Sequence, residues 1–253
     1  MGHNKDDMPF TSIKPSAELE DFVHVYWEHR NNLGKTQRMT IVPDSFFKLI
    51  IQIVDNKVVT CFLTGLWTKE IDVLLPENTV IYGIKFKILA PEYIFNVEIA
   101  ELVLSYKTLC SEFWNINNLE IGNFKIFIKQ LENILLQCLK RSCKLKPKKI
   151  QFSRLLYKMQ GNTSVEEISS RVKWSRRQIN RYLNKYLGVS LKTYLNIQKC
   201  HSAYTQIRHG QFFPDNGYYD QAHFIREIKK HTGKTPKELF EKQNDRFIQL
   251  KRV

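Results

Sequence analysis

The chain has 253 residues, of which 43% are hydrophobic and 25% charged, and its formal net charge is +14. This composition excludes wholesale disorder, and the length allows one large domain or two ordinary ones. The five cysteines include no Cys-x-x-Cys pair, which argues against a metal cluster and favours reduced thiols. The chain begins MGHNKDD, without an apolar stretch, and no apolar run approaches membrane-spanning length. We therefore expect a cytoplasmic protein with no membrane partner.

The charge is distributed unevenly along the chain. From Lys144 onward there are 24 basic and 8 acidic residues, a net charge of +16, whereas residues 1–143 carry a net charge of −2. So much positive charge repels itself in a compact domain, and a polyanionic partner is therefore expected. Nucleic acid is the leading candidate, an anionic membrane surface is the alternative, and a merely solvated basic face is the third possibility.

The first half has the pattern of β-structure. Apolar runs at residues 46–54 and 57–64 flank Asp55-Asn56, which predicts a hairpin, and residues 71–75 and 79–89 are further strand candidates. Apolar and charged residues alternate over 84–88, which predicts a sheet with one face in water. The histidines of this half precede the predicted sheet, so we expect surface positions rather than metal ligands. These histidines are His3, His24 and His29.

Helical spacing follows in the second half. Over residues 124–140 apolar side chains recur at threes and fours, and this predicts an amphipathic helix. The charged stretch 144–149 contains Pro147 and marks the best boundary. We therefore predict a β-rich sensor or oligomerisation domain at 1–123, a connecting helix and linker at 124–149, and a helical domain at 150–253.

Two capping boxes lie close together in the basic half. Ser164 is followed three residues later by Glu167, and Ser175 is followed three residues later by Gln178. Two short helices joined by a tight turn, the second rich in arginine, predict a helix-turn-helix.

The second of these helices offers base-reading side chains. Arginine can donate two hydrogen bonds to guanine in the major groove, and asparagine can make a two-point contact with adenine. A recognition helix presents its N-terminal residues to base edges. An amphipathic helix with a solvated basic face is the simpler alternative. The candidate DNA-binding residues here are Arg176, Arg177, Asn180 and Arg181.

Further helices are predicted downstream. Ser190 caps a long helix that Gly210 can end, Asp220 caps a helix to about His231, and Thr235-Pro236 opens a last one. Tyr218, Tyr219 and Phe224 are expected to pack within this region rather than to stack on bases, and the four tryptophans are expected in the core.

Residues 150–245 resemble the DNA-binding domain of the AraC family of transcription regulators. The similarity lies in residues 164–168, 175–181 and 233–236, and above all in GYYDQAHFIREIKK at 217–230. Such domains join two helix-turn-helix units by a long helix, and each unit sends one helix into the major groove. The resemblance implies a sequence-specific regulator that binds double-stranded DNA and contacts RNA polymerase, with no catalytic residue, metal or cofactor.

The resemblance also assigns base-facing positions. In the first unit these are Arg177, Asn180 and Arg181, and in the second unit Gln221, His223 and Arg226. The chain departs from the family before Gly217, where only residues 211–216 replace a helix of about two turns. Pro214 would interrupt any helix there, so the supporting helix of the second unit is predicted to be shortened or absent.

The N-terminal half is similar to the small β-rich, cupin-like sensor domains that precede some of these regulators. The similar stretches are residues 15–27, 41–44 and 83–86. This resemblance implies a small-molecule effector or a homodimer formed through the N-terminal domain. The expected fold is α+β, a β-rich cupin-like domain followed by an all-α double helix-turn-helix domain.

Two other functions stay open as alternatives. One is a non-specific basic protein that binds nucleic acid, and the other is an enzyme with an accessory DNA-binding domain. The enzyme is disfavoured because the chain has no P-loop, dinucleotide fingerprint, nucleophile elbow or His-Glu-x-x-His motif.

Overall fold

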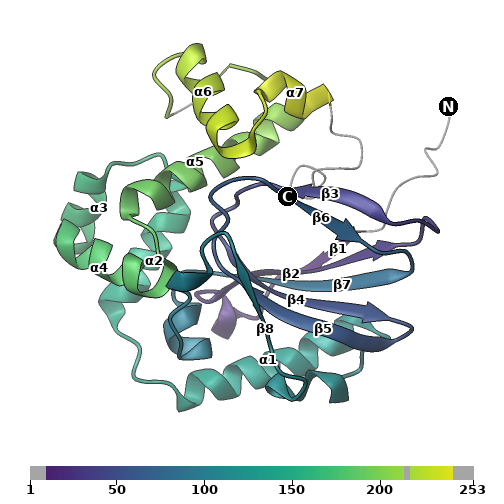
Figure 1. The fold of residues 1–253 in the computed structure, drawn as a ribbon. Coiled ribbons are helices and arrows are strands. Elements are labelled where there is room, and N and C mark those ends of the chain that lie inside the picture. The colour runs from purple at the N-terminus through teal and green to yellow at the C-terminus, as the bar shows by residue number, and fades with distance from the viewer. Residues whose placement is uncertain (1–9, 214–216, 242–253) are drawn as a thin grey trace.

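The computed structural model describes residues 10–213 and 217–241. The N-terminal half is built from strands and the C-terminal half from helices (Figure 1). The strands are β1 (Phe10–Ile13), β2 (Val23–Asn31), β3 (Gln37–Ile41), β4 (Phe47–Val54), β5 (Lys57–Thr64), β6 (Ile71–Leu75), β7 (Thr79–Phe86) and β8 (Tyr106–Thr108). The helices are α1 (Phe124–Arg141), α2 (Pro147–Met159), α3 (Val165–Val172), α4 (Arg176–Leu187), α5 (Leu191–Arg208), α6 (Gln221–Thr232) and α7 (Pro236–Glu241). Short helical turns lie at Ala17–Leu19, Pro91–Phe95, Ala100–Leu102 and Phe113–Asn118.

Two antiparallel sheets form the β-rich half. The larger has the strand order β1-β2-β7-β4-β5-β8, and the smaller pairs β3 with β6. The hairpin predicted at residues 46–64 is confirmed, because Val54 pairs with Lys57 across Asp55 and Asn56. Both turn residues have positive φ, as the tight turn of a two-residue hairpin requires. With the helical half that follows, the predicted α+β fold, a β-rich N-terminal half followed by a helical half, is confirmed.

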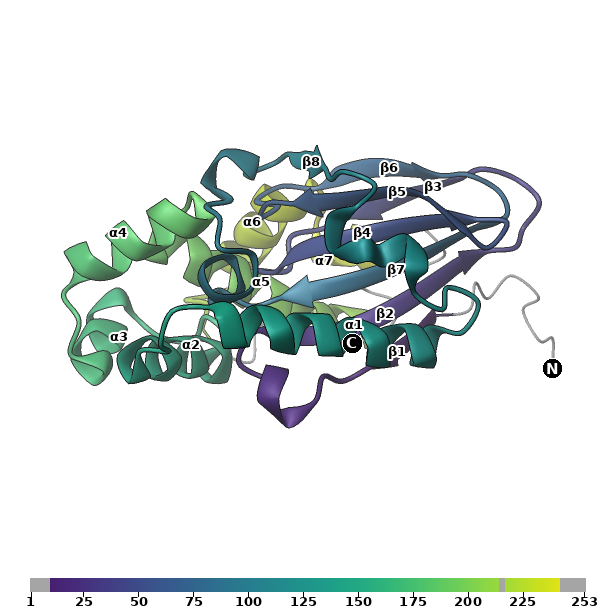
Figure 2. The same cartoon turned by 90° about the horizontal axis from the view of Figure 1, so that it is seen from below.

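The helix predicted at residues 124–140 is present as α1, and it packs on the larger sheet (Figure 2). The rings of Phe124 and Phe127 each lie 4.9 Å from the ring of Tyr82 on β7. The helix therefore buries its apolar face as part of the β-rich core and does more than connect two domains.

The alternation at residues 84–88 does not mark a wet face. Lys85 on β7 pairs with the buried Asp44, and its side chain lines a cavity between the two sheets. The sequence pattern predicts that this face of β7 is exposed to water, but the smaller sheet packs over it. Alternation within one strand cannot show that a second sheet lies on its polar face.

The expectation that the histidines precede the sheet is also wrong for two of them. His24 and His29 both belong to β2, which pairs with β7 in the middle of the sheet. His29 is buried and lines the cavity, while the ring of His24 stacks on Phe46 at 4.2 Å. His3 lies outside the described residues.

Buried apolar side chains form two main clusters in the helical half. The first is continuous from the larger sheet through α1 to the helices α2, α3 and α4. The second is small and joins α5, α6 and α7 to a residue of the β-rich half, Val42. Its buried members are Val42, Cys200, Ala203, Tyr204, Ile207, Phe224, Ile228 and Leu239. None of the helices within the described ranges is long and apolar enough to cross a membrane.

Candidate nucleic-acid interface and cavity

Helices α3 and α4 form the first helix-turn-helix unit, as predicted. Both halves of the capping box at Ser175 and Gln178 are made, and Gly188 ends α4 in the left-handed conformation. At the start of α3 only one half forms. The Ser164 hydroxyl accepts from the Glu167 backbone N–H at 3.0 Å, but the Glu167 carboxylate bonds Thr163 instead.

The arginines of α4 differ in their surroundings. Arg177 and Arg181 are exposed one helical turn apart, and within the described residues neither makes an ion pair. Arg176 is also exposed but pairs with Glu166 of α3 at 2.8 Å. Arg177 and Arg181 can therefore reach a partner outside the chain at no cost to an internal contact.

Asn180 is placed differently from the other candidates. Its side chain is half-buried, and its Oδ1 accepts from the Leu191 backbone N–H at 2.8 Å, at the start of α5. A two-point contact with adenine needs this oxygen as well as the amide nitrogen. The arrangement therefore uses Asn180 to fix α5 against α4, a role that the sequence pattern did not reveal.

Helix α6 belongs to the second unit. Asp220 caps it by accepting from the His223 backbone N–H at 2.6 Å, and Gln221 and Arg226 are exposed. His223 is half-buried, and its Nδ1 accepts from the Tyr219 backbone N–H at 3.3 Å. The predicted caps, Asp220 and Gly233, are both confirmed.

The predicted loss of the supporting helix is supported where the chain is described. After α5, residues 211–213 are not helical, and residues 214–216, including Pro214, lie outside the described residues. Phe224 is fully buried and Tyr218 packs on it at 4.9 Å, as expected. Tyr219 is 93% exposed, so the prediction that it packs inside the unit is wrong.

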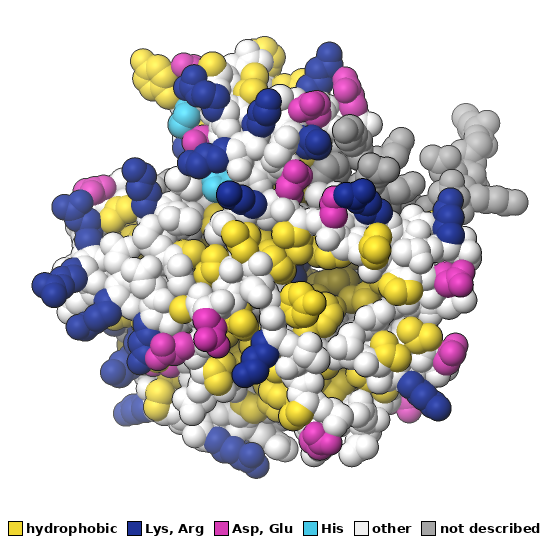
Figure 3. Space-filling model, in the orientation of Figure 1, with side chains coloured by type: hydrophobic (Ala, Val, Ile, Leu, Met, Phe, Trp, Pro, Cys, Tyr) yellow, Lys and Arg dark blue, Asp and Glu magenta, His cyan; other side chains and the backbone are white. Residues whose placement is uncertain are grey.

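Both units also contact the β-rich half. The Ile99 backbone N–H donates to the Tyr186 carbonyl at the end of α4 (3.0 Å). On the second unit, His231 at the end of α6 lies 3.1 Å from the Thr68 carbonyl. Figure 3 shows Lys and Arg side chains gathered over the helices, away from the hydrophobic hollow in the β-rich half.

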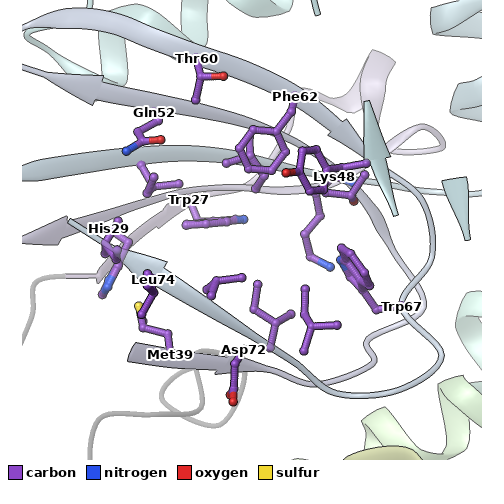
Figure 4. Close-up of a pocket in the computed structure, with 18 of the residues that line it drawn as sticks. Trp27, His29, Met39, Lys48, Gln52, Thr60, Phe62, Trp67, Asp72 and Leu74 are labelled. Carbon is purple, nitrogen blue, oxygen red and sulfur yellow. The ribbon is translucent and has the colours of Figure 1, made fainter. Parts of the chain in front are cut away.

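That hollow is a cavity of about 700 Å³ between the two sheets (Figure 4). Its wall is largely aromatic and aliphatic, with Trp27, Met39, Phe62, Trp67 and Leu74 among the lining residues. No group of three or more His, Cys, Asp or Glu side chains suited to a metal ion occurs in the part of the chain that the structure describes.

Two ammonium groups stand out in this apolar wall. Lys48 on β4 and Lys85 on β7 are directly opposite each other across the antiparallel pair. The Asp44 carboxylate bridges them, at 2.7 Å from the Lys48 Nζ and 2.9 Å from the Lys85 Nζ. Burial disfavours the charged carboxylate, but the two ammonium groups outweigh it and hold the pKa of Asp44 well below its usual range.

Two family models match the chain. Residues 168–242 match a family described as "Helix-turn-helix domain", and residues 11–106 match one described as "Domain of unknown function (DUF6597)". No curated protein matches the chain in sequence.

The solved structures found to be similar include several of ToxT from Vibrio cholerae. An apo variant of ToxT has a TM-score of 0.45 at 12% identity and covers 85% of this chain and 97% of its own. ToxT bound to a methylnaphthalenyl butenoic acid has a TM-score of 0.42 at 14% identity, covering 93% and 98%. ToxT bound to an unsaturated fatty acid has a TM-score of 0.39 at 10% identity, covering 95% and 97%.

The helix-turn-helix match covers most of both units described above, including the arginine-bearing α4 and the whole of α6. Together with the two capped helices and the long α5 between them, it confirms the helix-turn-helix domain that the sequence motifs indicate. The chain is a DNA-binding transcription regulator with a helix-turn-helix domain of the AraC type at residues 168–242.

Proposed function

We propose that residues 150–253 read two successive stretches of the DNA major groove, with α4 and α6 as the two reading helices. The observation that carries this proposal is the pair Arg177 and Arg181. Both are exposed on one face of α4, which a complete capping box fixes at its start. Guanidinium groups held on a rigid helix suit the two-point recognition of guanine.

The second reading helix contributes Gln221, His223 and Arg226. Of these, Gln221 and Arg226 are exposed near the capped end of α6. A regulator of this kind acts in the cytoplasm and contacts RNA polymerase when it is bound near a promoter. Two docked reading helices are expected roughly one DNA turn apart, about 34 Å.

The cavity favours a small-molecule effector over a purely dimerising role for the N-terminal domain. It lies between two sheets and is lined by large apolar side chains, which suits an apolar molecule. Lys48, Lys85 and Asp44 together carry one net positive charge at the cavity wall. The effector is therefore an apolar molecule with one anionic group, because a neutral ligand would leave that charge unbalanced.

Selection of bound sequences from a random DNA pool tests the DNA-reading part. We expect one enriched motif with two half-sites, and recovery of no motif would overturn the proposal. Arg181→Ala should relax the motif in one half-site only.

Tryptophan fluorescence tests the effector part, because Trp27 and Trp67 line the cavity. Dodecanoate should change the emission at lower concentration than dodecanol, which has the same chain and no charge. Equal responses would contradict an anionic effector.

A further inference from the structure

A short segment of the β-rich half is embedded in the DNA-binding helices. Residues 42–46, the 42–46 segment, connect β3 to β4. Val42 is fully buried in the apolar cluster of the second unit, among side chains of α5 and α6. At the other end, the ring of Phe46 stacks on Tyr157 of α2 at 5.6 Å. The segment is thus anchored in the helical half at both ends.

Between these anchors, two hydroxyl groups of α5 bind the backbone of the segment. The Tyr204 hydroxyl donates to the Pro43 carbonyl at 3.1 Å, and the Tyr194 hydroxyl donates to the Ser45 carbonyl at 3.0 Å. Both tyrosines are fully buried, so each bond forms away from water and its loss leaves a buried carbonyl unsatisfied. Helix α5 joins the two reading units, and its position therefore depends on the backbone of the segment.

The middle residue of the segment interacts with the cavity instead. Asp44 is 1% exposed, and its carboxylate bridges Lys48 and Lys85, both of which line the cavity. The same five residues therefore bind α5 through their backbone and the cavity wall through one side chain.

The charges around Asp44 are only partly balanced. Like charges directly opposite each other on antiparallel strands repel, and Lys48 and Lys85 hold that position. One carboxylate offsets one of the two ammonium groups. An anionic group that enters the cavity meets an excess of positive charge and competes with Asp44 for the same donors.

The backbone beside Asp44 is held in a costly conformation. Ser45 has a φ of 59°, in the left-handed region that residues other than glycine rarely adopt. Such a conformation persists only when surrounding contacts impose it. It relaxes when those contacts weaken, so the segment is a natural point of movement.

From these contacts we propose that Asp44 couples the cavity to α5: an anionic group bound at Lys48 and Lys85 displaces Asp44, and the 42–46 segment then releases Tyr194 and Tyr204. The inference rests on the proposed effector site and adds its regulation. A displaced Asp44 is a buried charge without partners, and the segment must move to relieve it. Freed from the segment, α5 no longer fixes the two reading helices relative to each other. The free energy needed to order the two reading helices is then taken from DNA binding, and the affinity for DNA falls.

The test uses the full-length chain, a duplex carrying the selected two-half-site motif, and dodecanoate as the probe. Dodecanoate should lower the DNA affinity of the wild-type chain by about fivefold or more, the usual lower range for coupling between two sites. It should also raise amide hydrogen exchange in α5. Dodecanol should change neither quantity.

Asp44→Asn keeps the size of the side chain and removes its charge. In this variant α5 should exchange faster even without the probe, and dodecanoate should bind at least as tightly as in the wild type. Dodecanoate should then leave the DNA affinity unchanged. Either wild-type exchange in α5 or a wild-type response to the probe in this variant would overturn the coupling.

The matched control is Asp55→Asn, which makes the same chemical change at an exposed residue in the turn between β4 and β5. Asp55 lies outside both the cavity lining and the 42–46 segment, so the response to the probe should be retained. If Asp44→Asn does not fold, Tyr204→Phe replaces it. That variant removes one bond to the segment without touching the cavity, and an undiminished response would then count against the proposal.

Failure of the coupling and failure of the proposed function give different results. If dodecanoate does not bind the wild-type chain, the effector part of the proposed function fails, and the exchange of α5 in Asp44→Asn still decides the coupling. If dodecanoate binds and α5 exchange is the same in Asp44→Asn and wild type, the coupling alone fails.

Discussion

In the first unit, α4 rests on a complete supporting helix, α3, and the apolar side chains of both helices belong to the core that continues into the β-rich half. In the second unit, residues 211–213 form no helix, and α6 is held instead by α5, α7 and Val42. The two reading helices of one chain are therefore supported by different means. The N-terminal domain supplies part of the contact that holds α6, through Val42.

The largest expected difference between the units is in stability. Phe152 and Phe224 are both fully buried, and replacing either by alanine should cost about 3–5 kcal/mol. Phe152→Ala should lower the melting temperature of the whole chain, because its cluster is continuous with the β-rich core. Phe224→Ala should loosen only the second unit, because its cluster is small. Thermal unfolding and hydrogen exchange measure both effects.

Phe213→Ala is the control for both variants. Phe213 is largely exposed, so its replacement should change the stability little. If Phe224→Ala unfolds the β-rich half as completely as Phe152→Ala does, the stability of the second unit is not independent of the β-rich core.

The next difference is in base preference. Arg177→Ala and Arg181→Ala should each cost about 1–3 kcal/mol at the cognate site and relax the preference for one base. Arg226→Ala should cost less, because the angle of α6 in the groove depends on fewer helical contacts. Competition between cognate and random duplexes measures all three variants.

Arg176→Ala is the matched control on α4. Arg176 already pairs with Glu166, so its replacement should leave the preference for cognate over random DNA unchanged. A larger loss of base preference from Arg226→Ala than from Arg181→Ala would reverse the ranking of the units.

The helical half could be predicted in detail because its signals are local. Ser175 and Asp220 begin helices through their own side chains, Gly233 ends one through its backbone conformation, and each does so in the structure. The β4–β5 hairpin was predictable for the same reason, since Asp55 and Asn56 accept the positive φ of a tight turn.

The missed features depend on residues far apart in the sequence. Nothing near Lys85 indicates that β3 and β6 cover its face or that Asp44 balances its charge. Strands β1 and β2 were not predicted, and β2 is where His24 and His29 lie. The Val42 contact also joins residues more than 150 positions apart, which no local pattern can reveal.

A smaller effect should come from Asn180, which helps to fix α5 on the first unit. Asn180→Ala removes the acceptor for the Leu191 backbone N–H and should cost about 1 kcal/mol of stability. It should weaken cognate and random DNA binding by the same factor, because the residue positions α5 rather than reads a base. Asn184→Ala, at an exposed position of the same helix, should leave the stability unchanged. A selective loss at one base pair would show instead that Asn180 reads the base.

The smallest effect sharpens the comparison at equivalent positions before the two reading helices. In the first unit, Trp174 precedes the cap Ser175 and packs on Phe152 with a ring distance of 5.7 Å. In the second unit, Tyr219 precedes the cap Asp220 and is 93% exposed. Trp174→Ala should therefore lower the stability, whereas Tyr219→Ala should leave it within about 0.5 kcal/mol of wild type.

The Tyr219 hydroxyl, beside the start of a reading helix, can still donate one hydrogen bond to DNA, which is worth about 0.5 kcal/mol at the low end of such bonds. Fluorescence anisotropy with the selected duplex should show that modest loss for Tyr219→Ala, and Tyr219→Phe should reproduce it if the hydroxyl is responsible. Unchanged DNA affinity in both variants would mean that this ring stays clear of the DNA.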